Sequence, residues 1–115
     1  MSNVGGKNGN VGGSDSVSNI QLYAYVDHPP AGTPTINKSS SNVTSITDGA
    51  VGLTVVNCTA LPSANYTAVI SANEVSSTNY IAAVSTKTTT AIGTVMGYTT
   101  STRYDADFGL IVTGA

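Results

Sequence analysis

The sequence predicts an all-β fold, a single small antiparallel β-sandwich or flattened barrel of about seven to eight strands. Three observations lead to this prediction. Apolar and polar residues alternate with a period of two in several short runs. These runs are bounded by Asn, Ser, Thr and Gly, and they recur about every 8–12 residues. No segment shows a convincing helical stripe, since the i, i+4 apolar pairs within residues 68–84 are rich in β-branched residues and are interrupted by Ser-Ser-Thr-Asn. A chain of 115 residues has room for one domain with one modest core.

The first predicted strand covers residues 20–27, IQLYAYVD. Its side chains alternate between two faces, with Leu22, Ala24 and Val26 on one face and Gln21, Tyr23 and Tyr25 on the other. This period, together with the aromatic residues, is typical of a strand. The prolines at 29, 30 and 34 then end the strand, because proline donates no hydrogen bond to a ladder.

A β-hairpin is predicted around Asp48 and Gly49, since both residue types tolerate a positive φ. Residues 36–47 before it form one or two strands, and residues 52–58 return from the turn. A further turn is expected at LPSAN, residues 61–65. The remaining strand candidates are 66–73, 79–88, 93–100 and 108–114.

Residues 1–19 differ in composition from the domain predicted over residues 20–115. They contain Asn-Val-Gly-Gly twice, and they are too rich in Gly, Ser and Asn to bury a core of their own. We interpret them as an extended attachment arm. Its glycines let another chain approach closely, and an extended arm can add to a neighbour's sheet edge. Its apolar contacts would come from Val4, Val11, Val17 and the boundary residue Ile20.

Low charge dominates the composition. Charged residues make up 9% of the chain, against about 25% in a typical soluble domain. The net charge of −2 and a pI near 4.8 argue against nucleic acid as a partner, and three Lys and one Arg do not form a polybasic membrane patch. The start of the chain does not resemble a signal peptide, and no apolar run approaches the roughly 20 residues of a membrane span. We therefore expect synthesis in a reducing cytoplasm, which suits a chain with one cysteine. A surface made polar by hydroxyls and amides repels its own copies little, as suits an assembly subunit.

Three segments resemble a β-domain that recurs in virion proteins of tailed bacteriophages. They are NVTSITD at 42–48, LTVVN at 53–57 and LPSANY at 61–66, and the closing DFGLIVTG resembles the apolar last strand of such chains. The resemblance extends over about residues 20–115. Two features depart from the pattern: Cys58 stands where an aromatic residue is common, and the first strand ends in Asp27-His28-Pro29-Pro30.

The resemblance implies a bacteriophage virion structural protein without enzymatic activity, and it implies a homotrimer. Relatives of this kind are attached to capsid surfaces, head fibres and tail fibres. The expected function is capsid decoration (cement) or a head-fibre subunit, held through the arm to other virion proteins, foremost the major capsid protein. The alternative is the tip or receptor-binding module of a tail fibre that recognises host glycans. A fibre usually needs a long shaft, and only 19 residues precede the domain, so the first function is favoured. The protein would assemble in the bacterial cytoplasm and reside in the virion.

The side chains that could act in catalysis or bind a metal ion do not form a recognised motif for either. Asp27 adjoins His28, but neighbouring strand residues point to opposite faces, so the pair is not expected to act together. We expect His28 to be a loop histidine. Asp105 and Asp107, with Asp48, offer too few oxygens for calcium, which prefers about six to eight. We interpret Asp105 and Asp107 as a solvated strand entry. No catalytic residue, metal ligand or cofactor site is predicted.

The remaining predictions concern the cysteine and three of the tyrosines. Cys58 has no basic neighbour and is expected to be a small buried hydrophobe. Tyr66 is expected to be a structural corner residue after the LPSAN turn. Tyr23 and Tyr25 share the outer face of the first strand, and tyrosine is favoured at interfaces and also stacks on sugars. These two residues are therefore the interface candidates within the domain.

Overall fold

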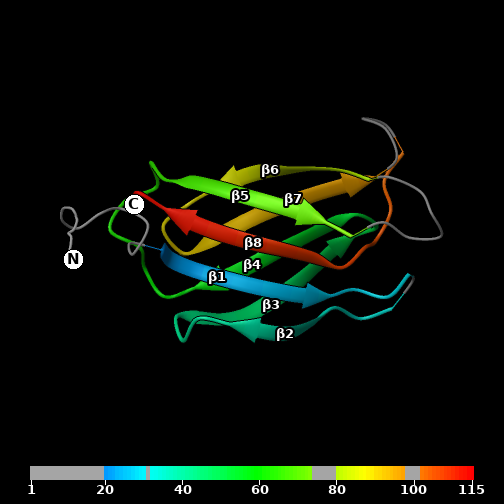
Figure 1. Cartoon of the computed structure of the whole chain (residues 1–115), viewed down its shortest axis with the longest axis horizontal. Coiled ribbons are helices and arrows are strands. Elements are labelled where there is room, and N and C mark those ends of the chain that lie inside the picture. Colours follow the sequence, from blue (N-terminus) through cyan, green and yellow to red (C-terminus); the bar gives the residue numbers. More distant parts are fainter. Residues whose placement is uncertain (1–19, 31, 74–79, 98–101) are drawn as a thin grey trace, which may run out of the picture.

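The computed structural model confirms the all-β prediction. It describes residues 20–30, 32–73, 80–97 and 102–115, and these form two four-stranded antiparallel sheets packed face to face (Figure 1). Within these residues there is no helix long and apolar enough to cross a membrane. The strands are β1 (Ile20–Asp27), β2 (Thr35–Ser39), β3 (Val43–Ala50), β4 (Leu53–Cys58), β5 (Thr67–Ala72), β6 (Ile81–Lys87), β7 (Ala91–Gly97) and β8 (Phe108–Thr113).

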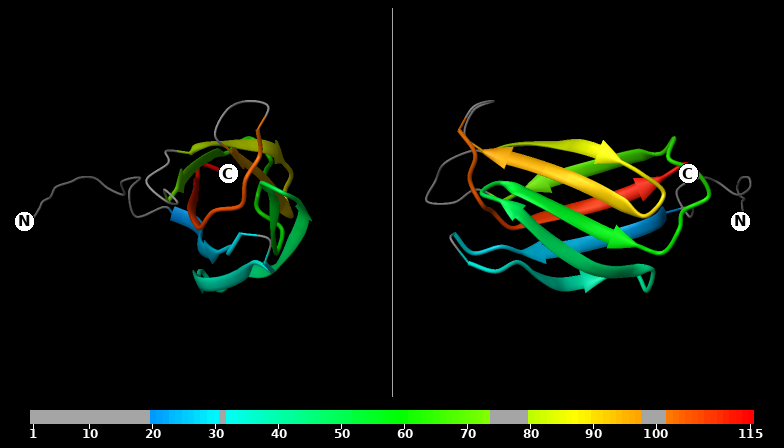
Figure 2. Two further views of the ribbon diagram at one scale, coloured as in Figure 1. Left: turned by 90° about the vertical axis from the view of Figure 1, so that its right-hand side faces the viewer. Right: turned by 180° about the vertical axis from the view of Figure 1, so that it is seen from behind.

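The strand order is β2-β1-β8-β5 in the first sheet and β3-β4-β7-β6 in the second. Three antiparallel pairs, β1–β2, β3–β4 and β6–β7, join strands that follow one another in the chain. The other connections pass from one sheet to the other, so β2 lies beside β3 on one side of the sandwich and β5 beside β6 on the other (Figure 2). The four edge strands are therefore β2, β5, β3 and β6.

The core lies between the sheets, and the period-two alternation assigns side chains to it. Leu22, Ala24 and Val26 of β1 are buried, as their alternation predicts, and so are Phe108, Leu110 and Val112 of β8. The second sheet contributes chiefly Val56, Cys58, Ile92 and Met96. The intervening residues of β1, β8 and β5 consequently point away from the core.

The hairpin between β3 and β4 forms where it was expected, but its turn was predicted wrongly. Asp48 and Gly49 lie inside β3, and the turn is made by Val51 and Gly52. Gly52 has a φ of 71°, and a Cβ there would collide with the Met96 carbonyl. Glycine is thus required at Gly52 for both its conformation and its close contact. A register shift between Asp48 and Ala50 lets β3 continue past the predicted turn.

Residues 36–47 contribute to two strands, β2 and β3, and these belong to different sheets. The strands near the later predicted segments are somewhat shorter than expected. Parts of two of these segments, residue 79 and residues 98–100, lie outside the described residues. The predicted arm of residues 1–19 also lies outside them.

Candidate assembly surface

The outer face of the β2-β1-β8-β5 sheet exposes large apolar side chains. Tyr23 of β1 is paired with Ile111 of β8, and Ile111 is paired with Val69 of β5. The three side chains therefore form one row across the sheet. Their exposed fractions are 46%, 41% and 58%. We call this row, with its neighbour Ile20, the apolar face.

A hollow of about 370 Å³ lies along this face. It follows the next row of the sheet, in which Lys38, Tyr25, Gly109 and Ser71 are successive partners. Gly109 has no side chain, so the row is low between Tyr25 and Ser71. Among the described residues that line the hollow, Lys38 alone is charged. An apolar surface with one cation is typical of protein-protein contact sites.

Polar groups around the hollow are partly engaged within the chain. The Tyr25 hydroxyl accepts a hydrogen bond of 2.8 Å from the Asn73 side-chain amide. The Tyr23 backbone N–H donates to the Ser40 hydroxyl at 3.0 Å. The Tyr25 ring is thus held at its hydroxyl, whereas Tyr23 is 46% exposed among the described residues.

The predicted interface residues are placed as follows. Tyr23 and Tyr25 lie on the outer face together, and Ile20 lies at its border with 47% of its surface exposed. Val4, Val11 and Val17 lie outside the described residues. Sequence reasoning missed Val69 and Ile111. Alternation within their strands assigns them to an outer face, but only the pairing of β1, β8 and β5 brings them beside Tyr23.

At one end of the sandwich, His28 forms a polar cluster that the sequence did not predict. It follows β1 and is 2% exposed. Its backbone N–H donates to Asp107 Oδ1 at 2.7 Å. Its ring Nε2 lies 3.4 Å from Asp105 Oδ1 and 3.6 Å from Asp48 Oδ1. The predicted loop position of His28 is right, but its burial beside two carboxylates was missed.

Asp105 and Asp107 do not form a solvated strand entry, and that interpretation is wrong. Asp105 is 6% exposed, and its Oδ1 accepts a 2.8 Å hydrogen bond from the Gly52 N–H. Asp107 is half-buried and bonds the His28 backbone. The two carboxylates accept from backbone groups far away in sequence, which a reading of local strand pattern does not reveal. They tie the segment before β8 to the end of β1 and to the β3–β4 turn.

The contacts of this cluster hold distant segments of the chain together. The Asp27 carboxylate accepts from the Asn37 side chain at 2.9 Å, and it is not paired with His28. The other ring nitrogen of His28, Nδ1, lies 3.2 Å from the Pro29 carbonyl oxygen. Among the described residues, no group of three His, Cys, Asp or Glu side chains is arranged to hold a metal ion. The cluster joins three segments, and Asp105, together with Pro30, Val51 and Tyr104, lines a hollow of about 210 Å³ beside it.

The opposite end is closed around Tyr66, which is 3% exposed. Its hydroxyl donates to the Thr88 carbonyl at 2.9 Å, which confirms it as a buried corner residue. Cys58 is also buried, as predicted, and burial raises the pKa of its thiol. Burial is likewise the main cause that raises the pKa of Tyr66, and Cys58 adds to it, while the bond to Thr88 acts in the opposite direction.

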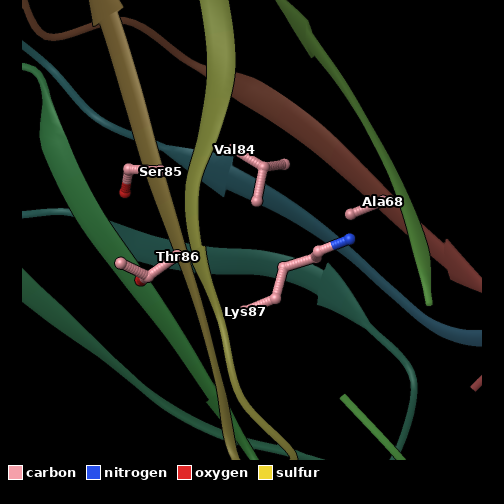
Figure 3. Close-up of a pocket in the computed structure, with 5 residues that line it drawn as sticks. All are labelled: Ala68, Val84, Ser85, Thr86 and Lys87. Carbon is pink, nitrogen blue, oxygen red and sulfur yellow. The ribbon is translucent and has the colours of Figure 1, made fainter. Parts of the chain in front are cut away.

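Lys87 joins the two sheets at the side where β5 and β6 lie beside each other. Its ammonium donates to the Tyr66 carbonyl at 2.7 Å and lies 5.4 Å from the centre of the Tyr66 ring. Figure 3 shows Lys87 and Val84 turned toward Ala68 of β5, around a hollow of about 200 Å³. The side chains of Ser85 and Thr86 occupy the space over Gly93 of β7.

Comparison of the chain with protein-family models, with curated proteins and with solved structures finds no match in any of the three.

Proposed function

We propose that this protein is a structural subunit of a larger assembly, without enzymatic activity. The observation that carries the proposal is the apolar face, on which Tyr23, Val69 and Ile111 stand exposed in one row. Large exposed side chains of this kind, gathered in one patch, mark interaction sites in soluble proteins. The low charge of the chain supports the same function, because copies repel one another little when only 9% of residues are charged.

The assembly that we propose is the virion of a tailed bacteriophage. The support is the sequence resemblance of the segments at 42–48, 53–57 and 61–66, which lie in β3, in β4 and at the corner before β5. The protein would be a capsid decoration (cement) or head-fibre subunit, assembled in the host cytoplasm as a homotrimer. Its arm, residues 1–19, would anchor it to other virion proteins, foremost the major capsid protein.

Deletion of residues 1–19 tests the anchor. The core is supplied by residues from Leu22 onward, so we expect the truncated chain to fold with the circular-dichroism spectrum of a β-protein. Particles assembled in the presence of the truncated chain should lack it, because three arms per trimer gain their affinity by acting together. Gel analysis of purified particles measures the occupancy. Full occupancy by the truncated chain would show that the β-domain is the anchor.

One observation favours a second function, the recognition of host glycans by a tail-fibre tip. The ring of Tyr23 is 46% exposed beside a shallow hollow, and exposed aromatic rings stack on sugars. A glycan-array measurement of the wild type and of Tyr23→Ala distinguishes this function. Sugar binding that Tyr23→Ala abolishes would favour the fibre tip over decoration.

A further inference from the structure

We infer that the apolar face, together with the edge of β5 that no described strand pairs with, is the surface that a second copy of this chain covers. This inference rests on the proposed function, because it names the partner for a surface already assigned to assembly. It identifies that partner as the chain itself, in contrast to the major capsid protein or a glycan.

The four edge strands differ in how they are protected against pairing with another strand. Proteins guard such edges with charges, with prolines and with bulges. In β6 the register shifts between Val84 and Thr86, and Lys87 follows. In β3 the register shifts near both ends, and Asp48 supplies a charge. In β2 Lys38 lies near a shift in the pairing with β1.

The β5 strand has none of these devices. Its sequence, TAVISA, contains no charge and no proline. All six of its residues pair with β8 in unbroken register, from Thr67 with Thr113 to Ala72 with Phe108. A regular, uncharged edge is the kind to which another strand adds most readily. One contact partly covers its start, where Lys87 donates to the carbonyl of the preceding residue, Tyr66.

The edge and the apolar face are continuous, since Val69 belongs to both. A strand added beside β5 would extend the outer surface of the sheet past Val69 and would cover its exposed side. On its inner side the same strand would meet the hollow between Ala68 and Val84 (Figure 3). Main-chain bonds and side-chain burial would therefore be gained in one contact.

The chemistry of the surface favours a copy of the chain as this partner. A glycan needs several donors and acceptors around its ring, but the hollow is lined mainly by aliphatic and aromatic side chains, and the Tyr25 hydroxyl is already bonded to Asn73. Among the described residues that line the two hollows, the charged ones are Lys38 and Lys87, and the Lys87 ammonium is already bonded to the Tyr66 carbonyl, so a highly charged protein would find little counter-charge. The chain itself matches the surface, because it is nearly uncharged and offers the same apolar row and the same β5 edge.

The size of the surface argues that both parts are needed. The four large side chains of the apolar face, which are about half exposed, offer on the order of a few hundred Å². A stable interface buries about 800 Å² per partner. The apolar face alone falls short of that area, so the strand edge must contribute as well. We therefore expect reversible, concentration-dependent self-association of the domain.

The test compares Val69→Lys with Val51→Lys in the full chain. The two valines are equally exposed, at 58% and 57%, but Val51 lies in the β3–β4 turn and outside this surface. Sedimentation equilibrium of the wild type should show multiples of 11.6 kDa. Val69→Lys should weaken self-association by about tenfold or more, and Val51→Lys should leave it unchanged. Tyr23→Arg, which is remote from the β5 edge, should weaken it as well.

If Val69→Lys sediments with the same mass as the wild type and has the circular-dichroism spectrum of the folded protein, the inference is wrong. The proposed function would survive that result, because the arm deletion tests it separately on particles. A wild type that stays at 11.6 kDa at high concentration, while Val69→Lys loses binding to capsid protein or to a glycan, would also overturn the inference. Circular dichroism of each variant identifies any loss of self-association that results from unfolding.

Discussion

The two ends of the sandwich are closed by different chemistry. One end is held by charged groups, the carboxylates of Asp105 and Asp107, which accept from the backbone N–H groups of Gly52 and His28. The other, which we call the neutral end, is held mainly by uncharged groups, with the Tyr66 hydroxyl bonded to the Thr88 carbonyl and Cys58 packed in the core, and Lys87 adds a contact to the Tyr66 carbonyl. Both arrangements connect the two sheets, but the charged end depends on buried groups that are costly to leave without a partner.

The ends of the sandwich stabilise the fold, and we propose that a different part, the apolar face, serves assembly. Most polar groups at the ends are bonded within the chain and so hold the fold together, whereas the buried Nε2 of His28 has no hydrogen-bond partner among the described residues. The apolar face is not covered by the described residues of the chain, so it is available to a partner. Substitutions at the ends should therefore change the free energy of unfolding, whereas exposed positions of the apolar face should change self-association with little effect on folding.

The largest effect is expected from Asp105→Ala at the charged end. This change removes the acceptor of the buried Gly52 N–H and the nearest carboxylate to His28. A buried donor that loses its charged acceptor costs up to about 3 kcal/mol, so we expect destabilisation of about that size. Urea unfolding, followed by circular dichroism, measures it.

Asp27→Ala is the matched control for that prediction. Its carboxylate bonds the exposed Asn37 side chain, and its loss should cost less than about 1 kcal/mol. Equal destabilisation by the two changes would mean that the buried carboxylate has no special role at the charged end.

A smaller effect is expected from Cys58→Ser at the neutral end. The thiol is buried and lies 3.8 Å from the Thr89 carbonyl, a distance at which a hydroxyl would be poorly bonded. A buried hydroxyl without a partner costs roughly 1–3 kcal/mol. The same burial should make Cys58 react slowly with thiol reagents in the folded protein. Rapid labelling under native conditions would place this side chain at the surface.

The neutral end was predictable from the sequence, and the charged end was not. Tyr66 follows a proline-containing turn, and Cys58 closes an alternating strand, so local pattern predicts the burial of both. The contacts of His28 join residues 79 positions apart in one bond, and no local pattern encodes them. The alternation of β1 likewise gave its outer face with Tyr23 and Tyr25. The neighbours of this face, Ile111 and Val69, depend on the strand order, which alternation does not determine.

The smallest effect is expected from a rise in pH, which ionises the Cys58 thiol. The pKa of the Cys58 thiol is raised by burial in the folded protein above its ordinary value of 9.0. The unfolded chain therefore loses the thiol proton first as the pH rises, and ionisation favours the unfolded state. This contribution to stability is complete at neutral pH, and it declines as the pH rises through the ordinary thiol range and toward the higher folded value.

The free energy of unfolding, measured by urea titration, should accordingly fall between pH 7 and about pH 9.5 by less than about 1 kcal/mol. Cys58→Ala should reduce that fall, although Tyr66, whose pKa is also raised, will retain part of it at higher pH. If the free energy of unfolding declines equally in wild type and in Cys58→Ala, other groups cause the alkaline sensitivity, and ionisation of the Cys58 thiol does not contribute to it.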